Sequence, residues 1–151
     1  MLQVKLAFLV FVMEVLDPRH AVMTNSEVFR LLQSRRKQQN ELPKDRRSKF
    51  LGTVIYETSK YLQDSPAAAQ RNVDIEKFIR AATRFKLTAV EILQLINLRP
   101  ITAVEIQLIV EECEERLTEE EIGSLITIIQ ENLPEPFSSD PKLEIDDQKE
   151  T

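Results

Sequence analysis

The sequence predicts an all-α protein: a compact bundle of short helices preceded by one separate helix. The chain has only two glycines in 151 residues, and 42% of its residues are hydrophobic, which is enough for a modest core. Apolar residues recur at the spacing of amphipathic helices. A Thr followed three residues later by a Glu, the spacing of a capping box, recurs at four places. The four pairs are Thr24/Glu27, Thr88/Glu91, Thr102/Glu105 and Thr118/Glu121.

Residues 1–23 are predicted to be a leader without fixed structure, of which residues 1–12 form an upstream extension. The run Leu6–Met13 is apolar, but a helix needs about 20 residues to cross a bilayer. No small-residue cleavage site follows it, and Glu14 and Pro18 come instead. A membrane-targeting segment is the alternative that this apolar run leaves open.

Residues 24–36 are predicted to form an N-terminal docking helix with Val28, Leu31 and Leu32 on its apolar face. Residues 37–49 are predicted to be a basic linker, broken by Pro43. Such a helix cannot keep its apolar face in water, so it must dock on its own domain or on a partner. Seven Lys/Arg fall between residues 35 and 49. A solvated connector explains them, and contact with phosphate is the alternative.

The predicted bundle covers residues 50–133, and its first helix is expected to begin at Thr53. The next helix begins near Asn72 and has an apolar face and a basic face. The apolar face consists of Ile75, Phe78, Ile79, Ala82 and Phe85. On the basic face, Lys77, Arg80 and Arg84 are candidates for weak nucleic-acid binding. A solvated helix face is the simpler interpretation, since no aromatic residues interleave these cations.

Three helix starts between residues 88 and 119 predict short helices joined by tight corners. Pro100 enforces one corner, because it lacks an N–H and disfavours the helical conformation at Arg99. The helix over residues 90–98 is apolar on all sides, which predicts that it is buried. The helix over residues 119–133 has one apolar face, which predicts that it covers the core from one side.

The helix expected over residues 103–117 carries two apolar stripes. The broad stripe contains Ile106, Ile109, Val110, Cys113 and Leu117. Val104 and Leu108 lie nearly opposite, at about 100° per residue. Two stripes predict a helix that touches its own core on one side and a partner on the other. A central helix with both stripes buried internally is the alternative.

The charge of the chain is strongly asymmetric. Residues 1–100 contain 17 Lys/Arg and 10 Asp/Glu, a net charge of +7, whereas residues 101–151 contain 3 and 15, a net charge of −12. The acidic residues continue into 134–151, a Pro- and Ser-containing segment predicted to be a disordered tail. The molecule is therefore expected to have a basic end and an acidic end.

No arrangement of residues points to catalysis, and no cofactor or metal is expected. His20 is the one histidine and lies in the leader, so nucleophilic catalysis would depend on that segment. Cys113 is the one cysteine and stands on an apolar stripe, as a core residue would. Two glycines cannot form a phosphate-binding loop. We expect a protein that is not an enzyme.

A family resemblance is visible in two segments of the chain. The longer segment is residues 95–122, LINLRPITAVEIQLIVEECEERLTEEEI, and the shorter one is residues 25–32, NSEVFRLL. Both segments resemble the small stalk subunit of nuclear RNA polymerase III, also known as the receptor component protein for calcitonin gene-related peptide. That family is similar to the archaeal polymerase F subunit. The resemblance covers residues 13–133.

The resemblance implies a bundle similar to the helicase-and-RNase-D C-terminal (HRDC) fold. It also implies a nuclear protein that pairs with a larger stalk subunit containing an OB-type barrel. The pair would join the remaining polymerase III core and support initiation at tRNA and 5S rRNA genes, with the partner doing most of the RNA binding. There are two alternatives. The chain could be an accessory protein of a membrane peptide-hormone receptor, or it could be a free nucleic-acid-binding module. The residues expected to bind the partner are Val28, Phe29, Leu31, Leu32, Arg99, Pro100, Val104 and Leu108.

Overall fold

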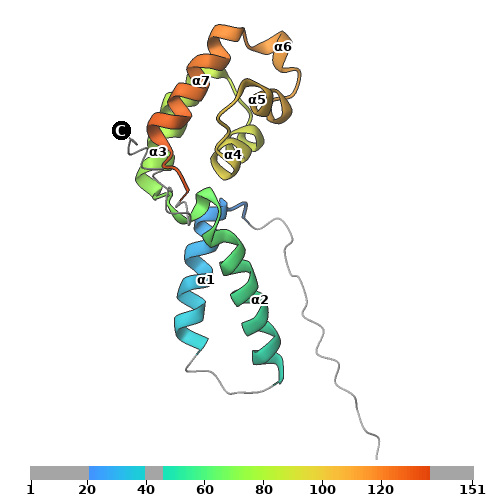
Figure 1. Cartoon of the computed structure of the whole chain (residues 1–151), viewed down its shortest axis with the longest axis vertical. Helices are drawn as coiled ribbons and strands as arrows, with labels where there is room; N and C mark the ends of the chain where they lie inside the picture. The colour runs from blue at the N-terminus through green and yellow to red at the C-terminus, as the bar shows by residue number, and fades with distance from the viewer. Residues whose placement is uncertain (1–20, 40–45, 137–151) are drawn as a thin grey trace, which may run out of the picture.

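The computed structural model describes residues 21–39 and 46–136, in which every regular element is helical (Figure 1). The predicted all-α fold is confirmed for these residues, and likeness to the HRDC fold stays a prediction. The elements are α1 (Asn25–Gln39), α2 (Arg46–Gln63), η1 (Pro66–Ala68), α3 (Asn72–Ala82), η2 (Thr83–Phe85), α4 (Ala89–Leu98), α5 (Ala103–Ile109), α6 (Cys113–Arg116) and α7 (Glu119–Asn132).

The helices form two lobes (Figure 1). In the first lobe, here called the hairpin, α1 and α2 lie side by side and η1 closes one end. Phe29, Leu62 and Ala67 form its buried apolar cluster, and Ile55 of α2 is buried as well. In the second lobe, here called the bundle, α3 lies beside α7, and α5 packs against α4, α6 and α7. Each lobe therefore has its own apolar core.

The larger core is that of the bundle. Its apolar residues come from every element between α3 and α7, and Phe78, Leu95, Ile106, Leu125 and Ile129 are fully buried. Burying a side chain of this size contributes about 1.5–3 kcal/mol relative to leaving it in water. The predicted apolar faces of residues 72–85 and 119–133 therefore point inward, except that Ile79 stays 40% exposed.

The two lobes are joined by hydrogen bonds at one end of α1. The Asn25 backbone N–H donates to Asn97 Oδ1 at 2.8 Å. The buried Ser26 hydroxyl donates to the Gln70 carbonyl at 2.9 Å, and Gln70 Nε2 donates to the Ile96 carbonyl at 2.7 Å. Buried polar groups that find partners in this way fix one geometry. The start of α1 is thus held at the end of α4.

All four predicted capping boxes are present. Each Thr hydroxyl accepts from the Glu backbone N–H at 3.2–3.4 Å, and each Glu carboxylate accepts from the Thr backbone N–H at 2.7–2.9 Å. These bonds satisfy backbone donors that have no partner within the helix. The pairs open α1, α4, α5 and α7, respectively.

The prediction of one helix over residues 103–117 is wrong. α5 ends at Ile109, Val110 is extended, and Glu112 has the left-handed conformation (φ 50°) before α6 begins. The Glu111 backbone N–H does not continue the helix and donates to the Glu91 carboxylate at 3.2 Å. A side chain from a distant helix therefore stabilises the break.

The helix predicted to begin at Thr53 begins earlier, at Arg46. α1 continues to Gln39. The segment between the two helices is therefore residues 40–45, whereas a linker over residues 37–49 was predicted. Lys, Arg and Gln are good helix formers. The basic composition that predicted a linker is therefore compatible with the last turn of α1 and the first turn of α2. α2 packs on α1, although the prediction placed it in the bundle. The predictions for residues 1–20 and 137–151 lie outside the described residues.

The prediction that the helix over residues 90–98 is buried on all sides is wrong. Leu95 and Ile96 are buried, but Val90 is 67% and Leu98 is 58% exposed. α4 lies at the edge of the bundle, where only one side meets the other helices. Its outer apolar residues are left for solvent or for a partner.

Candidate partner-binding surface

Four exposed apolar side chains follow one another from the end of α4 through α5. Leu98, Ile101, Val104 and Leu108 are 58%, 53%, 64% and 82% exposed. We call them the α4–α5 patch. Scattered exposed apolar residues are common, but four within eleven residues of a small protein make this stretch a candidate interaction surface. The second stripe predicted for α5 is therefore outside the core.

The α4–α5 patch borders a shallow hollow of about 220 Å³. Leu98, Pro100, Glu105, Leu108 and Ile109 line this hollow. Apolar side chains of a partner fit such a hollow, because apolar anchors seated in pockets dominate protein interfaces. The hollow lies where the chain turns from α4 into α5.

The turn that presents the patch is held by hydrogen bonds to Glu105. Glu105 accepts from the backbone N–H groups of Ile101 and Thr102 at 2.8 and 2.9 Å. These bonds, that of Ile101 first, lower the pKa of Glu105. A carboxylate that stays ionised keeps its hydrogen bonds at neutral pH. The start of the helix that carries Val104 and Leu108 is therefore held by Glu105.

Arg99 and Pro100, predicted to bind the partner, are both buried. Arg99 leaves the right-handed helical region, as its place before Pro100 predicted, and it adopts the left-handed conformation (φ 47°). Its Nε donates to the Leu133 carbonyl at 2.8 Å, which ties the end of α7 to the corner after α4. Arg99 therefore holds the corner in place, and only Pro100 reaches the hollow.

The predicted residues of α1 are divided by the structure. Phe29 is buried in the hairpin core, and Val28 and Leu32 pack against the same cluster. Leu31 remains 45% exposed. The docking that the helix required is thus provided within the chain, by α2 and η1. Leu31 lies in the hairpin and Leu108 in the bundle, so the structure does not bring the predicted partner residues into one surface.

The sequence reasoning missed an apolar stripe on the outer side of α2. Phe50, Val54 and Tyr61 are 66%, 60% and 74% exposed. Their spacing of four and eleven residues places them within about 40° on a helix of 100° per residue. That spacing was the available signal, but it required the helix to start before Phe50.

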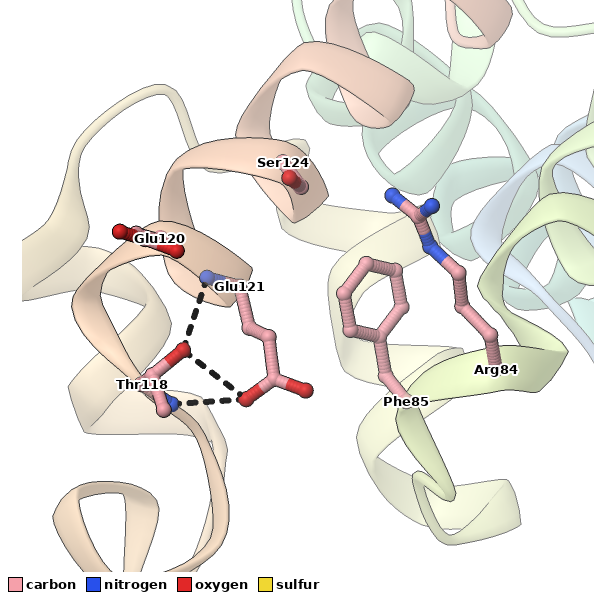
Figure 2. A pocket seen from close by; sticks show the side chains of 6 residues that line it. All are labelled: Arg84, Phe85, Thr118, Glu120, Glu121 and Ser124. Atoms are coloured by element: carbon pink, nitrogen blue, oxygen red, sulfur yellow. Dashed lines mark hydrogen bonds between the residues drawn. The ribbon is translucent and has the colours of Figure 1, made fainter.

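The predicted basic face of Lys77, Arg80 and Arg84 lies on α3 and η2 and is exposed, but it does not form a closed site. Arg80 pairs with Glu76 at 3.8 Å. The Arg84 guanidinium lies 4.7 Å from the centre of the Phe85 ring and lines a hollow of about 310 Å³ at the start of α7. Figure 2 shows the Glu121 carboxylate in the same hollow, held by its Thr118 cap. A carboxylate in this position opposes the binding of an anion.

Within the described residues, no group of His, Cys, Asp and Glu has the arrangement of a metal site. Cys113 is buried, and burial raises the pKa of its thiol, so it is a weak nucleophile. None of the described helices has the length and apolar content needed to cross a membrane.

The described residues define a small helical protein with an exposed apolar patch. The family profile described as RNA polymerase Rpb4 matches residues 22–133, and the chain belongs to this family. It is 33% identical over 131 residues to "DNA-directed RNA polymerase III subunit rpc9" of Schizosaccharomyces pombe, covering 81% of this chain and 100% of the relative. It is 27% identical over 110 residues to the protein of the same name in Dictyostelium discoideum, covering 69% and 79%. The resemblance found in the sequence is thereby confirmed.

Proposed function

We propose that this chain is the small, non-catalytic stalk subunit of nuclear RNA polymerase III. It pairs with the larger stalk subunit that contains an OB-type barrel, and through it joins the polymerase III core. In this position it supports initiation at tRNA and 5S rRNA genes. Its family and the names of its relatives support the assignment to this polymerase.

The observation that carries the pairing is the exposure of the α4–α5 patch. Leu108 is 82% exposed, whereas Ile106 on the same helix and Val110 just after the helix are buried in the core. Leu108 therefore contributes little to the core, and the exposure of its apolar side chain to water is unfavourable. The patch also lies inside residues 97–122, where the resemblance to the stalk subunit is densest. A folded chain with an exposed apolar surface is suited to a lasting complex.

The outer stripe of α2 is the second surface available to the same partner. Leu31 of α1 is the other exposed apolar residue predicted for this role. A stable complex buries roughly 800 Å² on each partner, more than four side chains supply. Contact with both lobes would provide that area.

Affinity purification of the tagged full chain from nuclear extract tests the assignment. The expected result is recovery of the larger stalk subunit and the polymerase III core in equal amounts. Leu108→Asp is expected to lose both, whereas the control Gln107→Asp, which adds the same charge one residue away on α5, is expected to keep them.

The two other functions considered for the chain give different results in the same experiment. A receptor accessory protein would be recovered from membrane fractions without polymerase subunits. A free nucleic-acid-binding module would be recovered without stoichiometric protein partners. Either result would overturn the proposal.

A further inference from the structure

The longest uninterrupted apolar stretch of the chain precedes α1. Residues 6–13, LAFLVFVM, are all apolar, and we call them the apolar run. They lie before Ala21, the first residue that the structure describes. Exposing such a run to water is unfavourable, as is exposing the α4–α5 patch. Contact between the run and the patch would remove both apolar surfaces from water.

The start of α1 brings the chain to one end of the patch. The Asn25 backbone N–H donates to Asn97 Oδ1 at 2.8 Å, and Leu98, the first residue of the patch, follows Asn97 directly. Figure 1 shows the start of α1 next to the bundle. Residues 14–20 connect the run to the described chain and can span up to about 23 Å. α5, which carries the rest of the patch, is only about 10 Å long. The run can therefore reach the whole patch.

The hollow beside the patch favours this surface over the outer stripe of α2. The hollow measures about 220 Å³, and Leu98, Leu108 and Ile109 give it an apolar lining. The run contains two Phe residues, and large apolar side chains seated in pockets anchor protein contacts. The outer stripe of α2 starts at Phe50, and α2 begins at the end of the hairpin that is away from the start of α1 (Figure 1). That stripe therefore extends away from the point where the connection enters the fold.

Charge favours one direction of the run along the patch. Lys5 is the one charged residue in residues 1–13, whereas residues 105–115 contain five exposed Glu and no basic residue. If the end of the run at Met13 lies near Leu98, where the connection enters, the other end lies near the end of α5. Lys5 is then close to the Glu residues that follow α5, and opposite charges attract.

We infer that the apolar run covers the α4–α5 patch in the isolated chain, in the direction that brings Lys5 to the end of α5. This inference does not rest on the assignment to a polymerase. It gives the run a function within the fold, which is to shield an apolar surface from water. A partner that binds the patch has to displace the run, so the run also controls access to the patch.

Photo-cross-linking within the full chain tests the inference. An amino acid that bears a benzophenone replaces Phe8 in one protein and Val12 in another, and mass spectrometry maps the cross-links formed by the monomer. Position 8 is expected to cross-link to α5 near Leu108, and position 12 to the corner near Leu98. Leu108→Asp is expected to lower the yield from position 8 about fivefold or more, because it places a charge in an apolar contact. The control Gln107→Asp is expected to have little effect.

Three results of the cross-linking would overturn the inference. Cross-links on the outer stripe of α2 would place the run in the hairpin. Cross-links between two copies of the chain would show that the run serves association. The absence of cross-links to any described residue would show that the run does not dock.

Binding of the dye anilinonaphthalene sulfonate, which fluoresces on exposed apolar surface, gives an independent test. Phe8→Asp with Phe11→Asp in the full chain is expected to raise the fluorescence about twofold or more, because the patch is uncovered. Adding Leu108→Asp is expected to remove this gain. The control, Gln3→Asp with His20→Asp, adds the same charge outside the run and should change little. A run that does not dock binds the dye itself, so a fall or no change with Phe8→Asp and Phe11→Asp would overturn the inference.

A lipid surface is the other place where an apolar run is stable in the absence of a protein contact. Sedimentation of the full chain with phosphatidylcholine vesicles distinguishes the two. The chain is expected to stay in the supernatant, because the run is already covered. Recovery with the vesicles that is abolished by Phe8→Asp with Phe11→Asp would overturn the inference and assign the run to a membrane. Circular dichroism checks that every variant remains folded.

Discussion

The Arg116 guanidinium reaches back across 25 residues and donates to the Glu91 carboxylate at 2.6 and 3.1 Å. Glu91 is buried at the third position of α4, where it also accepts from the Thr88 backbone N–H at 2.7 Å. One carboxylate therefore caps a helix and fastens α6 to it. Glu105, which occupies the same place in the second Thr-Ala-Val-Glu-Ile, is exposed and only caps.

The first prediction concerns this carboxylate and pH. The Arg116 hydrogen bonds, followed by those of the Thr88 and Glu111 N–H groups, outweigh burial and lower the pKa of Glu91 from 4.5 to about 2. A lowered pKa in the folded state stabilises the protein above the unfolded value. We expect that stability to be present at pH 7 and to be lost as the pH falls from about 4.5 to about 2. The full difference corresponds to about 3 kcal/mol.

Urea unfolding of Glu91→Gln at pH 7 and near pH 2 measures this effect. The variant is expected to lose about 2–3 kcal/mol at pH 7 and much less near pH 2, where about half of the native Glu91 carboxyls are protonated. Glu105→Gln is the matched control and is expected to lose about 1 kcal/mol at most. A loss at Glu91 that is the same at both pH values would show that the ion pair does not cause it.

The second prediction concerns the cap of α5. Thr102 accepts from the Glu105 backbone N–H at 3.4 Å, and its own N–H is bound by the Glu105 carboxylate. Thr102→Ala is expected to lower the free energy of unfolding by about 1 kcal/mol, because one backbone donor loses its partner. Thr102→Ser keeps the hydroxyl and should stay close to the native protein. Identical melting of all three proteins would contradict the cap.

The third prediction concerns Arg99. Truncation to Ala removes the bond to the Leu133 carbonyl, and the buried carbonyl then loses a charged donor. The expected loss of stability is about 2 kcal/mol, in the range of hydrogen bonds to charged groups. Glu135, 3.7 Å from the same guanidinium and 83% exposed in its side chain, should matter little. If Glu135→Ala destabilised as much as Arg99→Ala in thermal melts, the internal role of Arg99 would be wrong.

Local signals in the sequence predicted local structure well. The four capping boxes are set by residues three positions apart, so their presence follows from the sequence alone. The outward direction of Val104 and Leu108 followed from helical periodicity. Both features depend on neighbours within one or two turns.

What the sequence did not show depends on contacts between distant residues. The end of α5 at Ile109 is stabilised by Glu91, twenty residues before Glu111, and no periodicity reveals such a contact. A helical wheel likewise gives an apolar face to α1 but does not say that Leu62 of α2 covers it. Leu32 was therefore predicted to contact a partner, whereas in the structure it packs inside the hairpin.

The packing of Leu32 changes the experiment that best tests the partner surface. Leu32→Ala removes apolar contacts from the hairpin core and is expected to cost about 1–3 kcal/mol of stability, so a loss of pairing in this variant would be ambiguous. Leu108 is 82% exposed, and its replacement should not disturb the core. A change at Leu108 alone is the cleaner test.

The last prediction is that Leu108→Asp abolishes pairing with the larger stalk subunit and leaves the chain folded. Apolar anchors typically contribute about 1–3 kcal/mol each at an interface, and a carboxylate that becomes buried there without a partner adds a desolvation cost. Ile106 and Val110 continue to face the core, so the thermal midpoint should stay within about a degree or two of the native protein. A pull-down beside circular dichroism measures both properties. Unfolding of Leu108→Asp would mean that this side chain belongs to the core. Pairing at native strength, with Gln107→Asp behaving identically, would place the interface elsewhere, and the outer stripe of α2 would be the next surface to test by Val54→Asp.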